Sequence, residues 1–190
     1  MSNEISKVAD ATQSSLAVSK TTTETIGAGG VYTVTCVGPD GQIKWSDTFH
    51  NLVVNEGLQD MNTQYFKGSG YTAAWYLGLV TGPGSGNTYA AGNTLALHAG
   101  WTENTSYSGN RKAVTFGTAT TADPSVIDNS ASPSAFSITG TATIAGAFLT
   151  NVNTGTSGKL FSVGNFTGGD KSVASGDTLN VTYSFTLDAV

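Results

Sequence analysis

Charged side chains are scarce in this 190-residue chain, and positive charge is the scarcest of all. Charged residues make up 11% of the sequence, against roughly a quarter in an average soluble protein. The 8 Lys and Arg residues are scattered, and Arg111 is the one arginine. Binding along a nucleic-acid backbone requires clustered positive charge, and so does attraction to an anionic membrane surface. We therefore expect neither a nucleic-acid partner nor a membrane partner.

Cysteine is nearly absent as well, since Cys36 stands alone and excludes an intramolecular disulfide. It lies in the stretch VYTVTCVG, where we expect a small core residue of a strand. The N-terminal stretch MSNEISKVADATQSS lacks the basic and apolar segments of a signal peptide. No apolar run reaches the roughly 18 residues of a membrane-spanning helix. We expect synthesis in a cytoplasm and folding without oxidation.

Patterns that carry catalysis or metal binding are also missing. His50 and His98 have no second His or Cys at metal-ligand spacing, so structural roles are favoured. The loop GPGSGN at 82–87 lacks the Lys-Ser/Thr pair of a phosphate-binding loop, and no G-x-S-x-G nucleophile motif follows a strand. Asp123 and Asp128 are too few for a typical calcium loop. The sequence therefore predicts no enzyme activity, no cofactor and no metal.

A carbohydrate-cleaving enzyme remains an open alternative. Such an enzyme needs two carboxylates that face each other across a cleft lined by aromatic platforms. Trp75, Trp101 and Tyr107 are candidate platforms, but the 13 Asp and Glu residues single out no pair.

Residues 1–29 differ in composition from the rest of the chain. This segment is rich in Ser and Thr, has isolated apolar residues and closes on GAGG. Alone it buries too little apolar surface to offset the entropy of ordering. We interpret it as an extended N-terminal arm that becomes ordered against a partner. Its expected anchors at a capsid or subunit interface are Ile5, Val8, Leu16, Val18 and Ile26.

Residues 30–190 read as one β-rich domain. Apolar and polar residues alternate in 30–37 and recur in 43–49, on either side of the turn GPDGQ, which predicts a hairpin. Further runs predict strands at 73–80, 111–120, 134–151 (broken near Gly140), 159–166 and 177–190. Short antiparallel strands in such number indicate an all-β fold, an antiparallel β-sandwich of jelly-roll-like type.

One segment, about 55–67, has helical periodicity. Asn55 is a suitable N-cap, and Gly68 suits the left-handed position after the last turn. Leu58, Met61 and Tyr65 form one apolar stripe. We expect this short helix to plug an open end of the sandwich core with that stripe.

Glu103 and Arg111 flank the loop NTSYSGN and allow two interpretations. They form either an ion pair that pins a loop or a contact at a subunit interface, where the planar guanidinium is well suited.

Several motifs resemble a family of small structural proteins of tailed bacteriophage virions. They are NLVVNEGLQDM followed by WYLGLVTG, then WTENTSYSGNRKAVTFG, NSASPSAFSIT, ATIAGAFLTN, GKLFSVGNF and SVASGDTLNVTYSFTLDA. The resemblance covers residues 50–190 and implies a virion component, and it carries no catalytic residue over to this chain.

Composition and resemblance together suggest a capsid decoration (cement) protein. It would be made in the cytoplasm of the bacterial host and sit on the capsid exterior as a dimer or trimer. Residues 1–29 would reach across neighbouring subunits of the major capsid protein. The alternative is a tail- or fibre-associated protein with a receptor- or glycan-binding face around Trp101 and Tyr107.

Overall fold

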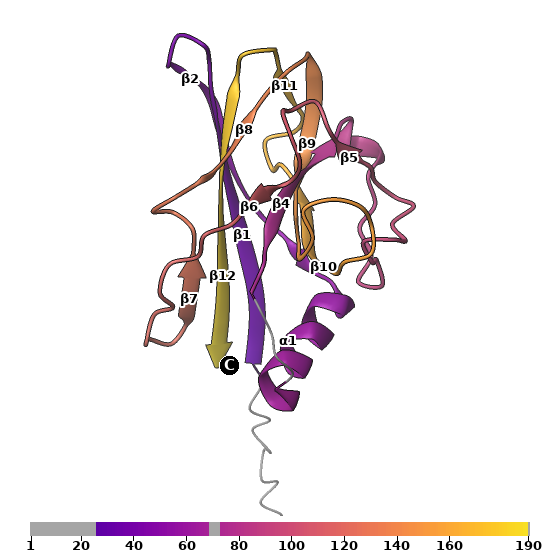
Figure 1. Cartoon of the computed structure of the whole chain (residues 1–190), viewed down its shortest axis with the longest axis vertical. Coiled ribbons are helices and arrows are strands. Elements are labelled where there is room, and N and C mark those ends of the chain that lie inside the picture. The colour runs from indigo at the N-terminus through magenta and orange to yellow at the C-terminus, as the bar shows by residue number, and fades with distance from the viewer. Residues whose placement is uncertain (1–25, 69–72, 190) are drawn as a thin grey trace, which may run out of the picture.

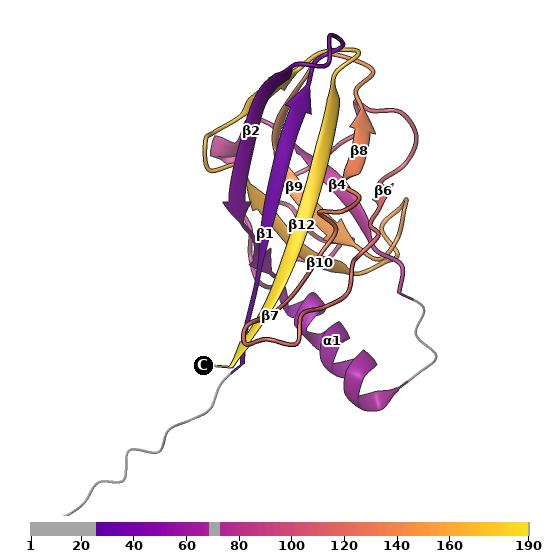
Figure 2. The ribbon, with the colours of Figure 1, turned by 90° about the vertical axis from the view of Figure 1, so that its left-hand side faces the viewer.

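The computed structural model describes residues 26–68 and 73–189, which fold into two facing antiparallel β-sheets and one α-helix. The two sheets stack face to face, and helix α1 (Asn55–Lys67) projects from one end of the stack (Figures 1 and 2). The all-β sandwich with one short helix is therefore confirmed. The arm residues Ile5, Val8, Leu16 and Val18 lie outside the described residues.

The first sheet is built around the first and last strands of the chain. Strand β1 (Ile26–Val37) pairs with β12 (Thr178–Ala189) along its whole length, from Ile26 opposite Ala189 to Val37 opposite Thr178. This five-stranded sheet has the order β2-β1-β12-β7, and β8 also pairs with β12. Its other strands are β2 (Ile43–His50), β7 (Ser125–Asp128) and β8 (Ser134–Ser137).

The second sheet has seven strands in the order β3-β10-β9-β4-β5, with β11 paired to β9 and β6 paired to β4. Its central strand β9 is buried at almost every position, so it is covered on both faces. The strands are β3 (Leu52–Val53), β4 (Tyr76–Thr81), β5 (Glu103–Asn104), β6 (Lys112–Ala113), β9 (Ala142–Thr150), β10 (Leu160–Asn165) and β11 (Lys171–Val173).

The predicted alternation in the first sheet is confirmed. Tyr32, Val34 and Cys36 of β1 point into the core and are fully buried. Thr33 and Thr35 occupy the opposite face, where their hydroxyls lie 3.1 and 3.0 Å from those of Thr48 and Ser46 on β2. The expected core role of Cys36 therefore holds, and the outer face of this sheet carries rows of hydroxyl groups.

The outer face of the second sheet is covered by the long loop that follows β4. This loop includes the 3-10 turn η1 (Gly84–Gly86). Leu95 and Trp101 pack with Val80 and Phe148 in a second cluster of buried apolar residues. The glycine-rich stretch 82–87 of this loop is thus followed by residues that complete this second apolar cluster.

Two strand predictions need correction. Residues 111–120 contain only the two-residue strand β6, because Thr120 bonds to Val126 through its backbone N–H and turns the chain back. Residues 26–29, which were expected to belong to the N-terminal arm, form the start of β1 opposite β12, so this strand begins at Ile26 and not at residue 30. The break of 134–151 near Gly140 is confirmed by β8 and β9.

Helix α1 spans the predicted range of about 55–67, but its N-cap residue and its packed face differ from the prediction. Val54 is the N-cap residue, without a side-chain capping bond, and Asn55 is already helical. Gly68 adopts the expected left-handed conformation with φ 53°. Of the predicted stripe, only Met61 packs against the core, whereas Tyr65 is 83% exposed. The helix does not plug the sandwich.

Candidate functional site: an apolar groove at the end of the sandwich

A groove of about 720 Å³ separates helix α1 from the paired ends of β1 and β12. We call it the end groove. Helix α1 and this two-stranded ribbon both lie at the lower end of the molecule in Figure 2. Its apolar lining consists of Ile26 and Ala28 of β1, Leu187 of β12, Leu58, Met61, Tyr65 and Phe66 of α1, and Trp75.

One wall of the groove is the end of the β1–β12 ribbon. Strand β2 pairs with β1 only as far as Val31 opposite His50, whereas β1 and β12 continue to Ile26 and Ala189. Ile26 and Ala28 alternate onto the same face of β1 as the buried Tyr32 and Val34, and together with Leu187 of β12 they line the groove.

The other wall is helix α1, which is fixed to the second sheet by its first turn. A Cβ atom on Gly57 would lie 2.6 Å from the carbonyl oxygen of Phe161, so glycine is needed for this close approach. One carboxylate oxygen of Glu56 accepts a hydrogen bond of 2.8 Å from the backbone N–H of Leu160, and the other lies 3.7 Å from Lys159. The later turns project outward from this attachment (Figure 1).

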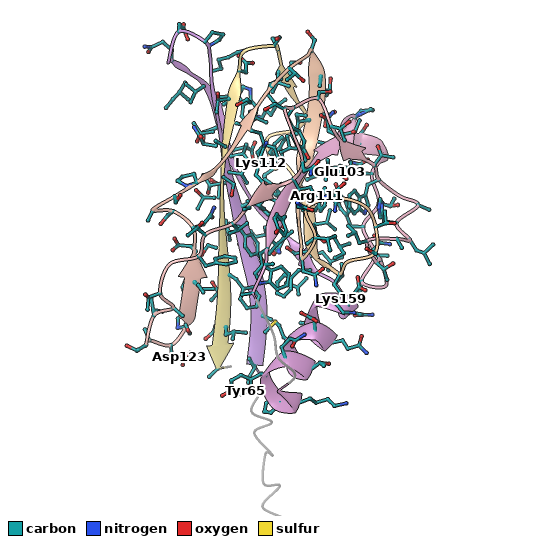
Figure 3. All side chains as sticks on the ribbon, in the orientation of Figure 1. Tyr65, Glu103, Arg111, Lys112, Asp123 and Lys159 are labelled. Atoms are coloured by element: carbon teal, nitrogen blue, oxygen red, sulfur yellow. The ribbon has the colours of Figure 1, made fainter. Side chains whose placement is uncertain are left out.

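Exposed apolar side chains concentrate at this end of the molecule. Six large hydrophobic residues are exposed in the described part of the chain, and four of them line the end groove. Figure 3 shows Tyr65 at the lower end of the molecule, beside the last turns of α1. The four are Ile26 (77% exposed), Leu58 (40%), Tyr65 (83%) and Phe66 (77%).

Asp60 is the charged residue in the lining of the groove, and only 5% of it is exposed. Its Oδ1 atom accepts a hydrogen bond of 3.3 Å from Nε2 of Gln64. The four ion pairs in the described part of the chain include neither Asp60 nor Lys67, the basic residue in the last turn of the same helix. The groove thus combines apolar walls with a carboxylate that no cation neutralises within those residues.

Glu103 and Arg111 form a two-point ion pair that pins a loop. Nε and Nη2 of Arg111 donate to the two carboxylate oxygens of Glu103 at 2.8 and 2.7 Å. Its Nη1 donates to the carbonyl oxygens of Val152 and Gly155, in the loop between β9 and β10. The guanidinium also lies 5.2 Å above the ring of Phe148, and Figure 3 shows the pair at the side of the second sheet.

Arg111 is 7% exposed, so its hydrogen bonds serve its own chain. The first of the two interpretations, an ion pair that holds a loop, describes this geometry. A subunit contact through Glu103 and Arg111 stays a prediction.

Of the three aromatic residues considered as sugar platforms, Trp75 is partly buried and lines the end groove, whereas Trp101 and Tyr107 do not offer an exposed face. Trp101 is 4% exposed and stacks on His98, with ring centres 3.9 Å apart. Tyr107 is 5% exposed and packs edge-on against Phe136. Burial raises the pKa of the Tyr107 hydroxyl above its usual value, and the nearby charge of Glu103 adds to the effect. A glycan-binding face around Trp101 and Tyr107 would first require these rings to leave the core.

The remaining candidates have local structural partners. Asp123 Oδ1 accepts the backbone N–H of Ala189, and Asp128 Oδ1 accepts that of Ser130. Hydrogen bonds from Ser130 lower the pKa of Asp128. Within residues 26–68 and 73–189, no three His, Cys, Asp or Glu side chains gather as a metal site would require. In the same ranges, no helix has the length and apolar character needed to cross a bilayer.

A buried hydroxyl network links the two sheets and was not signalled by the sequence. The Tyr32 hydroxyl on β1 lies 2.7 Å from Ser162 Oγ on β10, and Asn51 Nδ2 donates to the Tyr183 hydroxyl at 3.1 Å. Burial raises the pKa of Tyr183 to about 12 and that of Tyr32 as well. Tyr32, Ser162 and Tyr183 are fully buried, so their hydroxyl groups fix the two sheets relative to each other.

The sequence did not predict the end groove, although it did indicate the helical wall of the groove. The apolar stripe of Leu58, Met61 and Tyr65 was correctly identified, but its partners Ile26 and Leu187 come from opposite ends of the chain.

Comparison with known proteins adds no relative, since no family model, no curated protein and no solved structure matches this chain.

Proposed function

We propose that this protein is a structural component of a tailed-bacteriophage virion, a decoration protein on the outside of the assembled capsid. The motif resemblance over residues 50–190 motivates the virion assignment. The partners in this proposal are the major capsid protein and further copies of the chain itself. The particle exterior is the place of action, and the bacterial cytoplasm is the place of synthesis.

The end groove is the observation that carries a binding role. Monomeric soluble proteins rarely expose contiguous apolar patches, and larger ones mark interaction sites. Here most of the exposed large hydrophobic residues of the described chain surround one groove. Ile26, the first described residue, lines that groove.

The remaining surface suits many weak contacts on a lattice. The outer face of the first sheet carries hydroxyl pairs such as Thr33–Thr48 and Thr35–Ser46. Uncharged polar groups of this kind form wet interfaces in which water bridges the partners. Contacts that are weak singly become strong when many copies bind one shell.

The proposed mechanism is stabilisation by mass action. A protein that binds the assembled shell and not the separate subunits lowers the free energy of the shell. No chemical step is involved, and stability increases with the occupancy of the lattice.

The test compares binding of the purified full chain to assembled empty capsids and to unassembled capsid subunits. We expect co-sedimentation with capsids only, a higher melting temperature of the decorated shell, and a copy number in virions that matches the capsid lattice. A copy number that matches the symmetry of the tail would support the tail-associated alternative and contradict the decoration role. Absence of the chain from purified virions would overturn both.

A further inference from the structure

We propose that an extended segment of the capsid protein binds this chain as an added β-strand, paired with residues 26–30 of β1. We call residues 26–30 the open edge. The inference rests on the proposed decoration role for the identity of the partner, and it adds the place and the mode of binding. The free strand edge itself is a property of this chain alone.

The open edge is unpaired on one side because β2 stops short of it. In the part of the chain that the structure describes, β1 pairs only with β12 and β2. Strand β2 follows β1 as far as Val31 opposite His50, and the backbone N–H of Asn51 then donates to the carbonyl oxygen of Gly30 at 3.1 Å. Strands β1 and β12 continue together to Ile26, below the end of β2 in Figure 2.

The backbone of Ala28 points toward the side that β2 leaves vacant. In an antiparallel pair, alternate residues direct their N–H and C=O groups to opposite sides of the strand. Gly30 faces the β2 side, since its carbonyl oxygen bonds to Asn51, and Ala28 lies two residues before it. The N–H and C=O of Ala28 therefore face away from β12, whereas those of Gly29 face toward it.

The other edges of the first sheet are covered by loops of the same chain. Beside β7, the backbone N–H of Gly117 donates to the carbonyl oxygen of Asp128 at 2.8 Å. Beside β8, the backbone N–H of Ser108 donates to the carbonyl oxygen of Ser137 at 2.9 Å. Strand β2 is tied through the carboxylate of Asp47 to backbone N–H groups of the loop after β10. Within the described residues, the open edge has no comparable cover.

The open edge also lacks the features that protect a free strand from pairing. Exposed edges are commonly blunted by charged side chains, proline or a β-bulge. The sequence of residues 26–30 is IGAGG, without charge or proline, and its register with β12 is unbroken. A Cβ atom on Gly29 would meet nothing within 4 Å, so a second backbone has room to approach.

These features define the chemistry of the partner. A row of backbone donors and acceptors at strand spacing is matched by another extended polypeptide. Residues directly opposite Ile26 and Ala28 would project on the same face as these two, toward the end groove that both line. Ile26 is 77% exposed and needs an apolar cover. The partner is therefore a strand of about five residues with apolar side chains at alternate positions.

Hydrogen exchange of the full chain, free and bound to assembled empty capsids, tests the pairing directly. Exchange is read at single residues by mass spectrometry. We expect the amide of Ala28 to exchange rapidly in the free chain and at least about tenfold more slowly on the capsid. The amide of Gly29, which faces β12, is the internal control and should exchange slowly in both states.

Two substitutions test the edge by capsid co-sedimentation. Ala28→Pro removes the outward N–H without removing a bond to β12, as proline on an edge strand allows. Ile26→Asp places a charge on the inner face of the edge, which opposes strand addition. We expect each to weaken capsid binding about tenfold. Ile43→Asp is the matched control, since Ile43 is 69% exposed at the start of β2 in the same sheet, and it should bind as the natural chain does.

The outcomes separate this inference from the decoration role. If capsids bind the natural chain but leave exchange at Ala28 unchanged, or bind both edge variants undiminished, the inference is overturned and the decoration role stands. Slow exchange at Ala28 in the free chain also overturns it, because the chain would then cover its own edge. A natural chain that does not bind capsids overturns both. Circular dichroism establishes whether Ala28→Pro is folded, and if it is not, Ile26→Asp and its control decide.

Discussion

Asp177 is a carboxylate that the fold buries almost completely, at 1% exposure. Its Oδ2 atom accepts hydrogen bonds from Nζ of Lys44 at 2.7 Å and from the backbone N–H of Ala174 at 2.9 Å. The hydrogen bond from Lys44 is the main reason why the pKa of Asp177 lies below its usual value. The folded state therefore favours the ionised form of Asp177 more than the unfolded chain does.

The first prediction concerns the pH dependence of this pair. The stability that Asp177 contributes is complete above its unfolded pKa of about 4 and is lost as the pH falls through its lower folded pKa. We expect Lys44→Met to lower the urea midpoint at pH 7 and the difference from the natural chain to shrink in acid. Lys159→Met is the control, because its pair with Glu56 spans 3.7 Å, and its effect should be smaller. If Lys44→Met lowers the urea midpoint by the same amount at pH 7 and in acid, this account is contradicted.

The second prediction concerns the thiol of Cys36, which is fully buried in β1. Burial, and secondarily the charge of Asp177, raise the pKa of Cys36 to about 11. Since the thiolate is the reactive form, we expect no reaction with a disulfide reagent at pH 8 in the native protein. Full reaction should follow unfolding in guanidinium chloride. Rapid labelling of the folded chain would show that this strand opens readily.

Among the elements, helix α1 depends on its first turn. From helix propensity alone, Gly57→Ala would gain about 1 kcal/mol. The structure predicts the opposite, since the new methyl group would lie 2.6 Å from the carbonyl oxygen of Phe161. We expect a loss of roughly 1–3 kcal/mol in the free energy of unfolding, as overpacking causes. The exposed position Gln59, changed to Ala, should shift it by less than about 0.5 kcal/mol.

The loop between β9 and β10 depends on Arg111. Lysine keeps the charge but cannot reproduce the two-point contact with Glu103 together with donation to the carbonyl groups of Val152 and Gly155. We expect Arg111→Lys to cost about 1–3 kcal/mol and to speed hydrogen exchange in residues 151–158. Lys112→Arg, next in sequence, is the matched control. Unchanged exchange in this loop would show that Arg111 does not hold it.

For the molecule as a whole, association with further copies of the chain, which the proposed function includes, links folding to concentration. Binding that occurs only in the native state raises the melting temperature as the protein becomes more concentrated. For a chain of this length we expect roughly 2 °C for each tenfold increase. Calorimetry of the full chain checks this, and the melting temperature of Phe66→Asp should be independent of concentration. The same concentration dependence in that variant would place the contact elsewhere.

Much of the fold follows from short-range patterns. Alternation identified the β1–β2 hairpin, the last strand and the core position of Cys36, because side chains of a strand point to opposite faces in turn. Apolar spacing and Gly68 placed helix α1 at about residues 55–67, in agreement with its observed range. The short strand β7 gave too little periodicity to be recognised, and the run 111–120 was overextended because the turn at Thr120 depends on contacts with Val126 and Ser125.

The candidate site follows from the sequence only in part. Periodicity shows that Leu58, Met61 and Tyr65 share one side of a helix, but it does not show whether anything covers that side. The answer depends on the pairing of β1 with β12, which brings Ile26 and Leu187 opposite the helix from the two ends of the chain.

The amino-acid sequence alone therefore establishes an all-β, charge-poor chain with one helix, because strand and helix periods are local properties. The tertiary structure alone decides that this helix is attached by its first turn and leaves its aromatic residues exposed. It also decides that Arg111 bonds within its own chain. Both outcomes depend on contacts between residues far apart in the sequence, whose free energies no local pattern encodes.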